Sequence, residues 1–122
     1  MSTRILVVDD SETVRTLISF ILKAQGYEVD VAINGVSALE HIYKENYDLV
    51  VCDVNMPKMD GLTLIKILRF QDLYKELPII CVTTEESEDD IQRGLEAGAN
   101  VYLIKPTDPT KLLANVKMLL GK

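Results

Sequence analysis

The sequence has few of the features that mark several common kinds of protein. It contains two cysteines, Cys52 and Cys81, both within short apolar runs, so we expect buried, reduced thiols rather than a disulfide or a metal site. It has no cluster of Lys and Arg, and its net charge is −6. Because binding to nucleic-acid phosphates needs clustered cations, DNA is not an expected ligand.

Long apolar segments are absent as well. The apolar runs fall far short of the ~20 residues that cross a bilayer, so we expect no membrane segment. The N-terminal stretch MSTRILVVDD has one basic residue and no long apolar part, unlike a secretory signal, and a cytoplasmic location is expected. A chain of 122 residues without a linker-like or repeated stretch predicts one domain, residues 1–122, with no output domain attached.

What the sequence does contain is a regular alternation of two patterns. Five short apolar runs predict strands at Ile5–Val8, Val29–Ala32, Leu49–Cys52, Ile79–Val82 and Val101–Ile104. The segments between these runs have apolar residues at helical spacing. One apolar face of the first predicted helix is formed by Val14, Leu17, Ile18, Ile21 and Leu22. The second begins near Asn34-Gly35 and has Val36, Leu39 and Tyr43 on one side.

The remaining three helices are marked mainly by their boundaries. The third is expected to begin after Gly61. Ser87, with Asp90 three residues later, forms a capping-box pattern at the start of the fourth. Gly94 lies inside this helix at a cost of roughly 1 kcal/mol relative to alanine, so we expect it to be the least stable of the five. Asp108-Pro109 is a typical start for the fifth.

Five alternations of strand and helix, (βα)₅, predict a doubly wound α/β fold, in which helices cover both faces of an open five-stranded parallel sheet as a three-layer sandwich. In such a sheet, ligands bind at the carboxyl ends of the strands. Four of the predicted strands are followed there by Asp9-Asp10, Asp53, Thr83-Thr84 and Lys105-Pro106. If these strands are neighbours, the polar groups converge in one shallow pocket.

These groups favour one kind of chemistry. Crowded carboxylates repel one another, and Mg²⁺, which prefers oxygen ligands, relieves that repulsion. Lys105 adds positive charge from the other side, and Thr83 adds a hydrogen-bond donor. An ionised aspartate needs no general base, and the single histidine, His41, lies in the second helix, where we expect an ordinary surface residue. The pattern therefore predicts that Asp53 is a carboxylate nucleophile that accepts a phosphoryl group.

The same residues carry a resemblance that covers essentially the whole chain. In this order and at these strand ends, Asp9-Asp10, Asp53 followed by Met56-Pro57 and Gly61, Thr83, and Lys105-Pro106 resemble the receiver domain of two-component response regulators. The resemblance implies a flavodoxin-like fold with strand order 2-1-3-4-5. It also implies that a histidine kinase phosphorylates Asp53. Such a domain is a signalling protein rather than an enzyme, although it catalyses its own phosphorylation and slow autodephosphorylation.

The resemblance further implies a metal site and a phosphoryl contact. Asp10 and Asp53 would bind Mg²⁺ together with the backbone carbonyl of Asn55, and Asp9 would contribute through water. Lys105 would approach the phosphoryl group on Asp53 from the opposite side.

A switch pair and a set of residues that influence phosphoryl lifetime are implied in the same way. On phosphorylation the Thr83 hydroxyl would move toward the phosphoryl group, and the Tyr102 ring would turn inward behind it. Asn55 and Glu85 match the chemotaxis-type pattern and, together with Thr84, would influence how long the phosphoryl group persists. Thr84 stands where the family usually has alanine or glycine.

The expected output is binding of a downstream protein, the flagellar switch or another target, at the fourth helix, fifth strand and fifth helix. The chain looks most similar to single-domain regulators of the CheY type, which favours chemotaxis. A phosphorelay shuttle and a pseudo-receiver, an unmodified protein-binding module, stay open as alternatives. A phosphatase of the haloacid dehalogenase kind is disfavoured because it needs Asp-x-Asp on the first strand, whereas Asp53-Val54-Asn55 follows the third.

Overall fold

Five parallel strands form one sheet in the computed structural model, which describes residues 2–121. They are β1 (Arg4–Val8), β2 (Glu28–Ala32), β3 (Leu49–Cys52), β4 (Ile79–Thr83) and β5 (Val101–Ile104). Their order in the sheet is β2-β1-β3-β4-β5, and every neighbouring pair is parallel. The predicted flavodoxin-like α/β fold and its strand order are confirmed.

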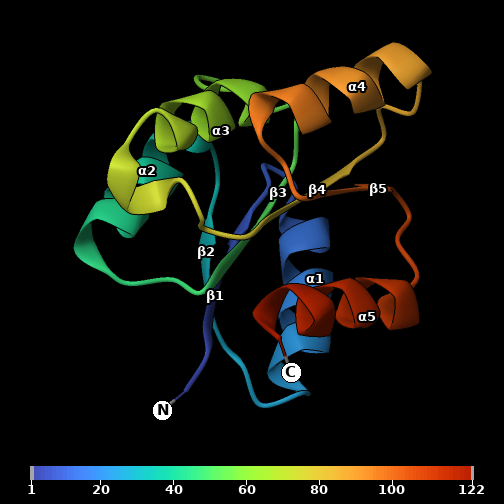
Figure 1. Cartoon of the computed structure of the whole chain (residues 1–122). Coiled ribbons are helices and arrows are strands. Elements are labelled where there is room, and N and C mark those ends of the chain that lie inside the picture. The colour runs from blue at the N-terminus through green and yellow to red at the C-terminus, as the bar shows by residue number, and fades with distance from the viewer. Residues whose placement is uncertain (1, 122) are drawn as a thin grey trace.

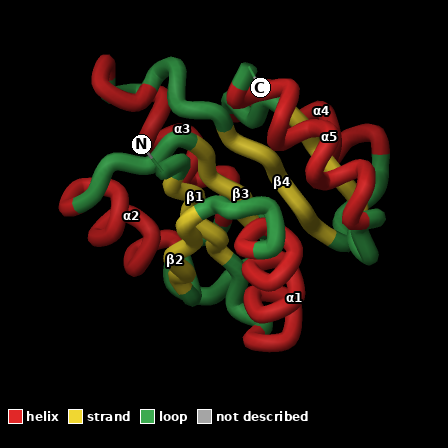
Figure 2. Tube along the Cα trace, turned by 90° about the horizontal axis from the view of Figure 1, so that it is seen from below, coloured by secondary structure: helices red, strands yellow, loops and turns green. Residues whose placement is uncertain are grey.

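Helices cover both faces of this sheet. They are α1 (Glu12–Lys23), α2 (Gly35–Lys44), α3 (Gly61–Arg69), α4 (Glu88–Ala97) and α5 (Pro109–Leu120), with a short 3-10 helix, η1 (Asp72–Tyr74), after α3. Figure 1 shows α2, α3 and α4 on one side of the sheet and α1 and α5 on the other. Figure 2, seen from below, shows the strands in the middle of the molecule with the helices around them. In the part of the chain that the structure describes, no helix could cross a membrane on grounds of length and apolarity.

The sheet divides the hydrophobic core into two clusters. Because successive strand residues face opposite sides, Leu6 packs beneath α2, α3 and α4, whereas Ile5 packs beneath α1 and α5. Strands β1, β3 and β4 are buried on both faces, which explains their unbroken apolar sequences. Cys52 and Cys81 are register neighbours on β3 and β4, and both are buried free thiols, as predicted.

Side-chain caps begin all five α-helices. The capping residues are Ser11, Asn34, Asp60, Ser87 and Asp108, and each accepts a hydrogen bond from a backbone N–H two or three residues later. These bonds satisfy N–H groups that have no partner within the helix. The predicted starts of the second, fourth and fifth helices are confirmed. Each cap follows a strand or its loop closely, so it also determines where the chain leaves the carboxyl edge of the sheet.

The predicted apolar side of α2 is partly wrong. Val36 and Tyr43 are 44% and 54% exposed, while Ala38 and Ile42 are buried against the sheet and Leu39 lies at the margin of the core. Both stripes have helical spacing and apolar side chains, so spacing alone did not distinguish them. The stripe that contains the small alanine allows the helix to lie close to the sheet, and packing therefore selects it.

Arg69, the last residue of α3, connects three separate segments. Its guanidinium donates to the Gly98 carbonyl at 2.9 and 3.1 Å, to the Tyr74 carbonyl at 2.7 Å and to Asn100 Oδ1 at 3.0 Å. Asn100 Oδ1 also accepts a bond from the Ile79 N–H at 2.8 Å. The C-terminal end of α4 is therefore attached to α3, η1 and the start of β4.

Candidate functional site

The carboxyl ends of β1, β3, β4 and β5 bring polar residues together at one edge of the sheet. Backbone hydrogen bonds continue past the strands: the Asp53 N–H donates to the Val8 carbonyl at 2.9 Å, and the Lys105 N–H to the Thr83 carbonyl at 2.8 Å. These bonds fix the backbone from which the site side chains project. As predicted, the structure gathers Asp9, Asp10, Asp53, Thr83 and Lys105.

Three carboxylates form the centre of the site. Asp9, Asp10 and Asp53 each place one oxygen within 4.8 Å of the others. Asp9 and Asp53 are only 2% and 6% exposed, whereas Asp10 is open to solvent. Oxygen ligands of this charge and spacing, one of them accessible, fit a hard divalent cation such as Mg²⁺. The acidic cluster is therefore consistent with the predicted metal site.

Lys105 neutralises part of this negative charge. Its Nζ lies 2.8 Å from Asp9 Oδ2 and 3.2 Å from Asp53 Oδ2, and 16% of its side chain is exposed. Burial acts against the charge on Lys105, but its bonds to the two carboxylates outweigh burial and raise the pKa of Lys105. Lys105 is therefore a permanent cation between two nearly buried anions.

The Asp53 carboxylate is held in an unfavourable environment for its charge. Burial and the neighbouring Asp9 carboxylate raise the pKa of Asp53, and together they outweigh the opposing effects of Lys105 and of the Thr83 hydroxyl. The Asp53 and Asp9 carboxylates therefore repel each other, and a bound cation or the loss of the negative charge on Asp53 would reduce this repulsion.

This environment leads to a prediction about stability and pH. Without divalent cations, Asp53→Asn is expected to raise the free energy of unfolding at pH 7. The raised pKa means that ionising Asp53 costs more in the folded than in the unfolded chain; this penalty is absent below the unfolded pKa and complete above the folded one. Urea unfolding measured from pH 4 to pH 8 should show a gain that grows as pH rises. A gain that grows as pH falls would contradict the assigned direction.

Asp9 has more partners than sequence reasoning identified. Its Oδ1 accepts a hydrogen bond from the Ser11 N–H at 2.9 Å, and its backbone carbonyl accepts one from Arg15 Nη1 at 2.8 Å. With Lys105 on Oδ2, both carboxylate oxygens of Asp9 already have donors. This leaves Asp10 and Asp53 better suited than Asp9 to bind a cation directly. A signal for Ser11 was present, because serine after two aspartates at a strand end is typical of an N-cap.

Glu85 connects the acidic cluster to β5. Its N–H donates to Oγ1 of the fully buried Thr83 at 3.4 Å, and its carboxylate accepts a hydrogen bond from the Asn55 amide. Its backbone carbonyl accepts a bond from the Tyr102 hydroxyl at 2.7 Å. The sequence singled out all four residues, but not that Glu85 touches the other three. Thr84, next to it, is exposed and lines a cavity of about 240 Å³ with Lys105.

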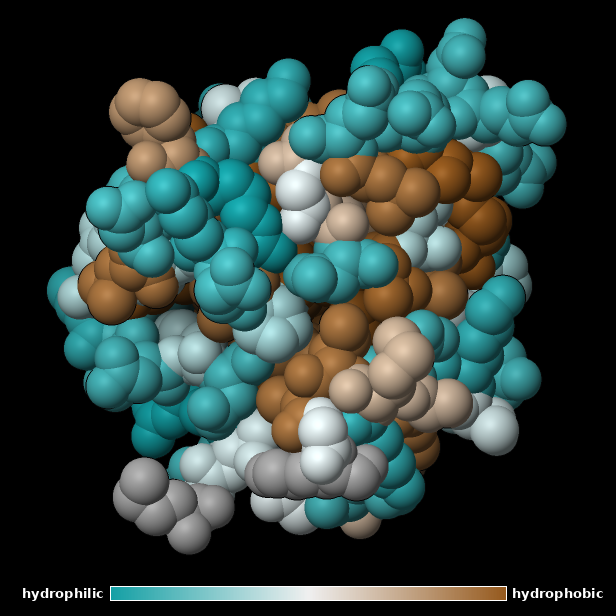
Figure 3. Space-filling view, viewed as in Figure 1, coloured by the Kyte–Doolittle hydropathy of each residue, from teal (hydrophilic) through white to brown (hydrophobic). Residues whose placement is uncertain are grey.

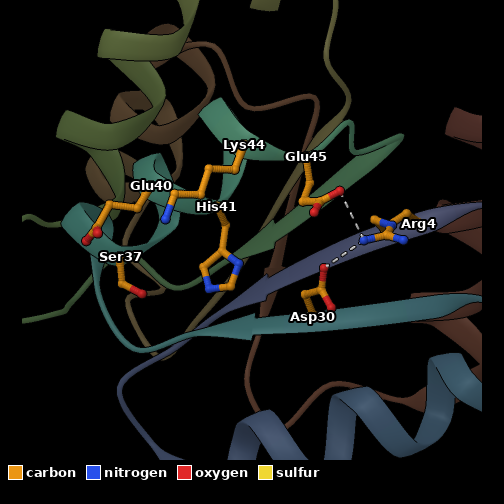
Figure 4. Close-up of a pocket in the computed structure, with 7 residues that line it drawn as sticks. All are labelled: Arg4, Asp30, Ser37, Glu40, His41, Lys44 and Glu45. Carbon is orange, nitrogen blue, oxygen red and sulfur yellow. Dashed lines mark hydrogen bonds and ion pairs between the residues drawn. The ribbon is translucent and has the colours of Figure 1, made fainter.

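His41 lies away from this site and is more enclosed than predicted. It is half-buried, its Nδ1 lies 3.4 Å from the Tyr47 hydroxyl, and it lines a polar groove between α2 and the edge of the sheet. Figure 4 shows its ring pointing toward β2, with Arg4 bonded to Asp30 and Glu45 nearby. The expectation of an ordinary surface residue is therefore too simple, because the ring is half-buried and lies beside the Tyr47 hydroxyl. No contact joins this groove to Asp53 among the described residues, so His41 takes no part in the site.

Several known proteins have sequences similar to this chain. The chain matches the family described as the response regulator receiver domain over residues 5–117. It is 42% identical over 122 residues to the alkaline phosphatase synthesis transcriptional regulatory protein PhoP of Bacillus subtilis, covering all of this chain and 50% of PhoP. It is 41% identical over 121 residues to chemotaxis protein CheY1 of Helicobacter pylori, with 97% of each chain covered. The chain thus spans about half the length of PhoP and of the other transcriptional regulators that it matches.

Known structures share the fold as well. The chemotaxis protein CheY4 of Vibrio cholerae superposes with a TM-score of 0.91 at 39% identity, covering 98% of this chain and 99% of CheY4. The family match extends over nearly all of the residues that the structure describes, and it includes every residue of the acidic cluster, Thr83 and Lys105. On this basis, the chain belongs to the response regulator receiver domain family.

Proposed function

We propose that Asp53 accepts a phosphoryl group from a histidine kinase and that the resulting change of charge switches the binding of a partner protein. The observation that carries this proposal is the position of Asp53, a nearly buried carboxylate that contacts Lys105 and has the Asp9 and Asp10 carboxylates as neighbours. Asp9 shares this burial, cation and acidic neighbourhood, but both of its carboxylate oxygens already accept hydrogen bonds, Oδ1 from the Ser11 N–H and Oδ2 from Lys105.

The chemistry follows from these groups. A carboxylate oxygen of Asp53 attacks phosphorus, the bond from phosphorus to the donor nitrogen breaks, and the imidazole of the kinase leaves with the electron pair. Lys105 stabilises negative charge on the transferred group, and the Thr83 hydroxyl can donate to it. Asp10, Asp53 and the backbone carbonyl of Asn55 would hold Mg²⁺, which supplies further neutralisation of charge when bound. No proton has to be removed from Asp53, so no general base is required.

The first test is transfer from a small phosphodonor. With acetyl phosphate and Mg²⁺, the protein should gain one phosphoryl group by intact-mass measurement, and Asp53→Asn should gain none. Asp72→Asn, which changes an aspartate exposed at η1, should be labelled like the unchanged protein. Label retained on Asp53→Asn would show that the acceptor is a different residue, and no Mg²⁺ binding at millimolar metal would favour the pseudo-receiver alternative.

We also propose that Asn55, Thr84 and Glu85 influence the lifetime of the phosphoryl group. The Asn55 amide donates to the Glu85 carboxylate, and Asn55 lies only two residues after Asp53, so we expect this pair to restrict the approach of water to Asp53. Glu85→Ala should open this approach to water and shorten the phosphoryl half-life severalfold, measured as loss of label after removal of the donor. Glu86→Ala changes the neighbouring exposed glutamate and serves as the control. Equal half-lives in the two variants would remove Glu85 from this role.

The surface formed by α4, β5 and α5 is the proposed binding site for a downstream protein. Figure 3 shows hydrophobic residues over β5 between α4 and α5. Leu95 of α4 and Met118 of α5 are 45% and 62% exposed. The first turn of α4 adds Glu88, Asp89 and Asp90. A partner with apolar and basic side chains fits this surface. The similarity to CheY1, together with Asn55 and Glu85, supports a role in chemotaxis, while the similarity to PhoP supports control of transcription.

A further inference from the structure

Gly94 and Tyr102 contact each other so closely that Gly94 has no room for a side chain. Gly94 is buried in α4, and a Cβ atom there would lie 2.6 Å from Cδ2 and 2.7 Å from Cε2 of the Tyr102 ring. Cβ atoms essentially never come within 3.0 Å of such atoms. Gly94 does not have a positive φ, so its backbone does not need glycine. The ring is therefore the structural reason for glycine at a position where alanine would favour the helix.

The contact holds the Tyr102 ring in a defined place. Tyr102 lies on the edge strand β5, half-buried against the cluster beneath α4, and its hydroxyl donates to the Glu85 carbonyl at 2.7 Å. Burial, followed by the nearby Cys81, Asp90 and Glu85, raises the pKa of Tyr102 to about 12. One edge of the ring thus packs against Gly94 of α4, and its hydroxyl is bonded to Glu85, which follows β4.

We propose that Gly94 is a positioning residue for Tyr102: the missing side chain on α4 allows the ring to lie where its hydroxyl reaches Glu85. The Glu85 N–H in turn donates to Thr83 and its carboxylate accepts from Asn55, so the ring position is linked through Glu85 to two residues of the candidate site. The inference rests on the proposed function of Asp53 and of the Thr83–Tyr102 pair, and it adds a residue of α4 to that pair.

Adding one methyl group should therefore have two opposite effects. Alanine improves the helix at position 94 relative to glycine. At the same time it forces the Tyr102 ring away from α4, and because β5 is an edge strand, the ring can turn into solvent. The ring then loses its hydrogen bond to Glu85 and part of its burial. Removing the ring should leave only the favourable effect.

A double-mutant cycle tests the contact. In the otherwise unchanged protein, Gly94→Ala should lower the urea midpoint of unfolding, whereas in a Tyr102→Ala background it should raise the midpoint. If Gly94→Ala alone fails to fold while the Gly94→Ala/Tyr102→Ala protein folds, this result also supports the clash. The same midpoint shift in both backgrounds would overturn the proposal, as would failure of both proteins to fold, because the contact would then involve a residue other than Tyr102.

Two further measurements separate positioning from stability alone. With ¹³Cζ-labelled tyrosine, the Tyr102 signal should titrate near pH 12 in the unchanged protein and closer to pH 10 in Gly94→Ala. Binding of beryllium fluoride with Mg²⁺, a mimic of the phosphoryl group, should weaken at least about fivefold in Gly94→Ala. In the Tyr102→Ala background, Gly94→Ala should leave this affinity unchanged.

The outcomes distinguish this proposal from the proposed function. If the unchanged protein does not bind the mimic, the proposed function fails, while the unfolding cycle still decides whether Gly94 positions Tyr102. If the unchanged protein and Gly94→Ala bind the mimic equally well, the proposed function stands and the link from Gly94 to the site is overturned.

Discussion

Lys105→Met is expected to lower the free energy of unfolding by about 3 kcal/mol at pH 7 without divalent cations, because it leaves two nearly buried carboxylates without their shared cation. Lys105 Nζ lies 2.8 Å from Asp9 and 3.2 Å from Asp53, and the side chains of these aspartates are only 2% and 7% exposed. Methionine keeps the length of the side chain and its apolar packing. The decrease in the free energy of unfolding should therefore come almost entirely from removal of the Lys105 charge.

Urea unfolding followed by circular dichroism measures this loss. Lys66→Met, on the exposed side of α3, is the matched control and should change the free energy of unfolding by less than about 0.5 kcal/mol. Asp53→Asn, introduced into the Lys105→Met protein, should recover part of the loss because one of the two unpaired charges is removed. If Lys105→Met and Lys66→Met unfold at the same urea concentration, Lys105 does not stabilise the acidic cluster.

Gly61→Ala is expected to lower the free energy of unfolding by about 3 kcal/mol and to weaken Mg²⁺ binding, since overpacking a rigid site costs this much. A Cβ atom at Gly61 would lie 2.1 Å from the Asp53 carbonyl oxygen and 3.0 Å from Val54 Cα. Both are backbone atoms, so no side-chain rotation relieves the contact. The Gly61 N–H also donates to the Val54 carbonyl at 2.8 Å, which ties the start of α3 to the segment after Asp53.

Gly26→Ala separates this effect from the general cost of replacing glycine. Gly26 has a φ of +91° and no atom within 4 Å of the added Cβ, so its cost should be limited to the left-handed backbone, about 1 kcal/mol. It lies between α1 and β2, away from the acidic cluster, and should leave Mg²⁺ affinity unchanged. Isothermal titration of Mg²⁺ and urea unfolding of the two variants measure both quantities. Equal Mg²⁺ affinities would mean that Asp53 keeps its position despite the added methyl group.

The fold was predictable mainly because the three central strands, β1, β3 and β4, are buried on both faces. A run such as Leu49–Cys52 has no polar residue to interrupt it, so its limits in the sequence agree with those of β3. Polar residues then begin at the edge of the sheet, and this is why Asp53 and Lys105 could be placed at one edge from sequence alone. The α2 face was harder, because Ala38 carries too little apolar surface to mark the buried side by itself.

The finer contacts of the site could not be predicted for a different reason. The Tyr102 hydroxyl binds the backbone carbonyl of Glu85, and Arg15 binds that of Asp9. Every residue has a backbone carbonyl, so residue types contain no signal for which one is used. The closeness of Gly94 to Tyr102 depends likewise on the distance between α4 and β5, which only packing determines.

Helix α4 is anchored at its C-terminal end, and we expect its N-terminal end to move more easily. Arg69 fixes the Gly98 carbonyl at its C-terminal end with two hydrogen bonds, whereas its N-terminal end follows the short segment that contains Glu85. Any rearrangement around Glu85 should therefore swing the first turn of α4 about a pivot near Gly98. That turn carries Glu88, Asp89 and Asp90. The proposed phosphorylation of Asp53 would therefore move three negative charges on the protein surface.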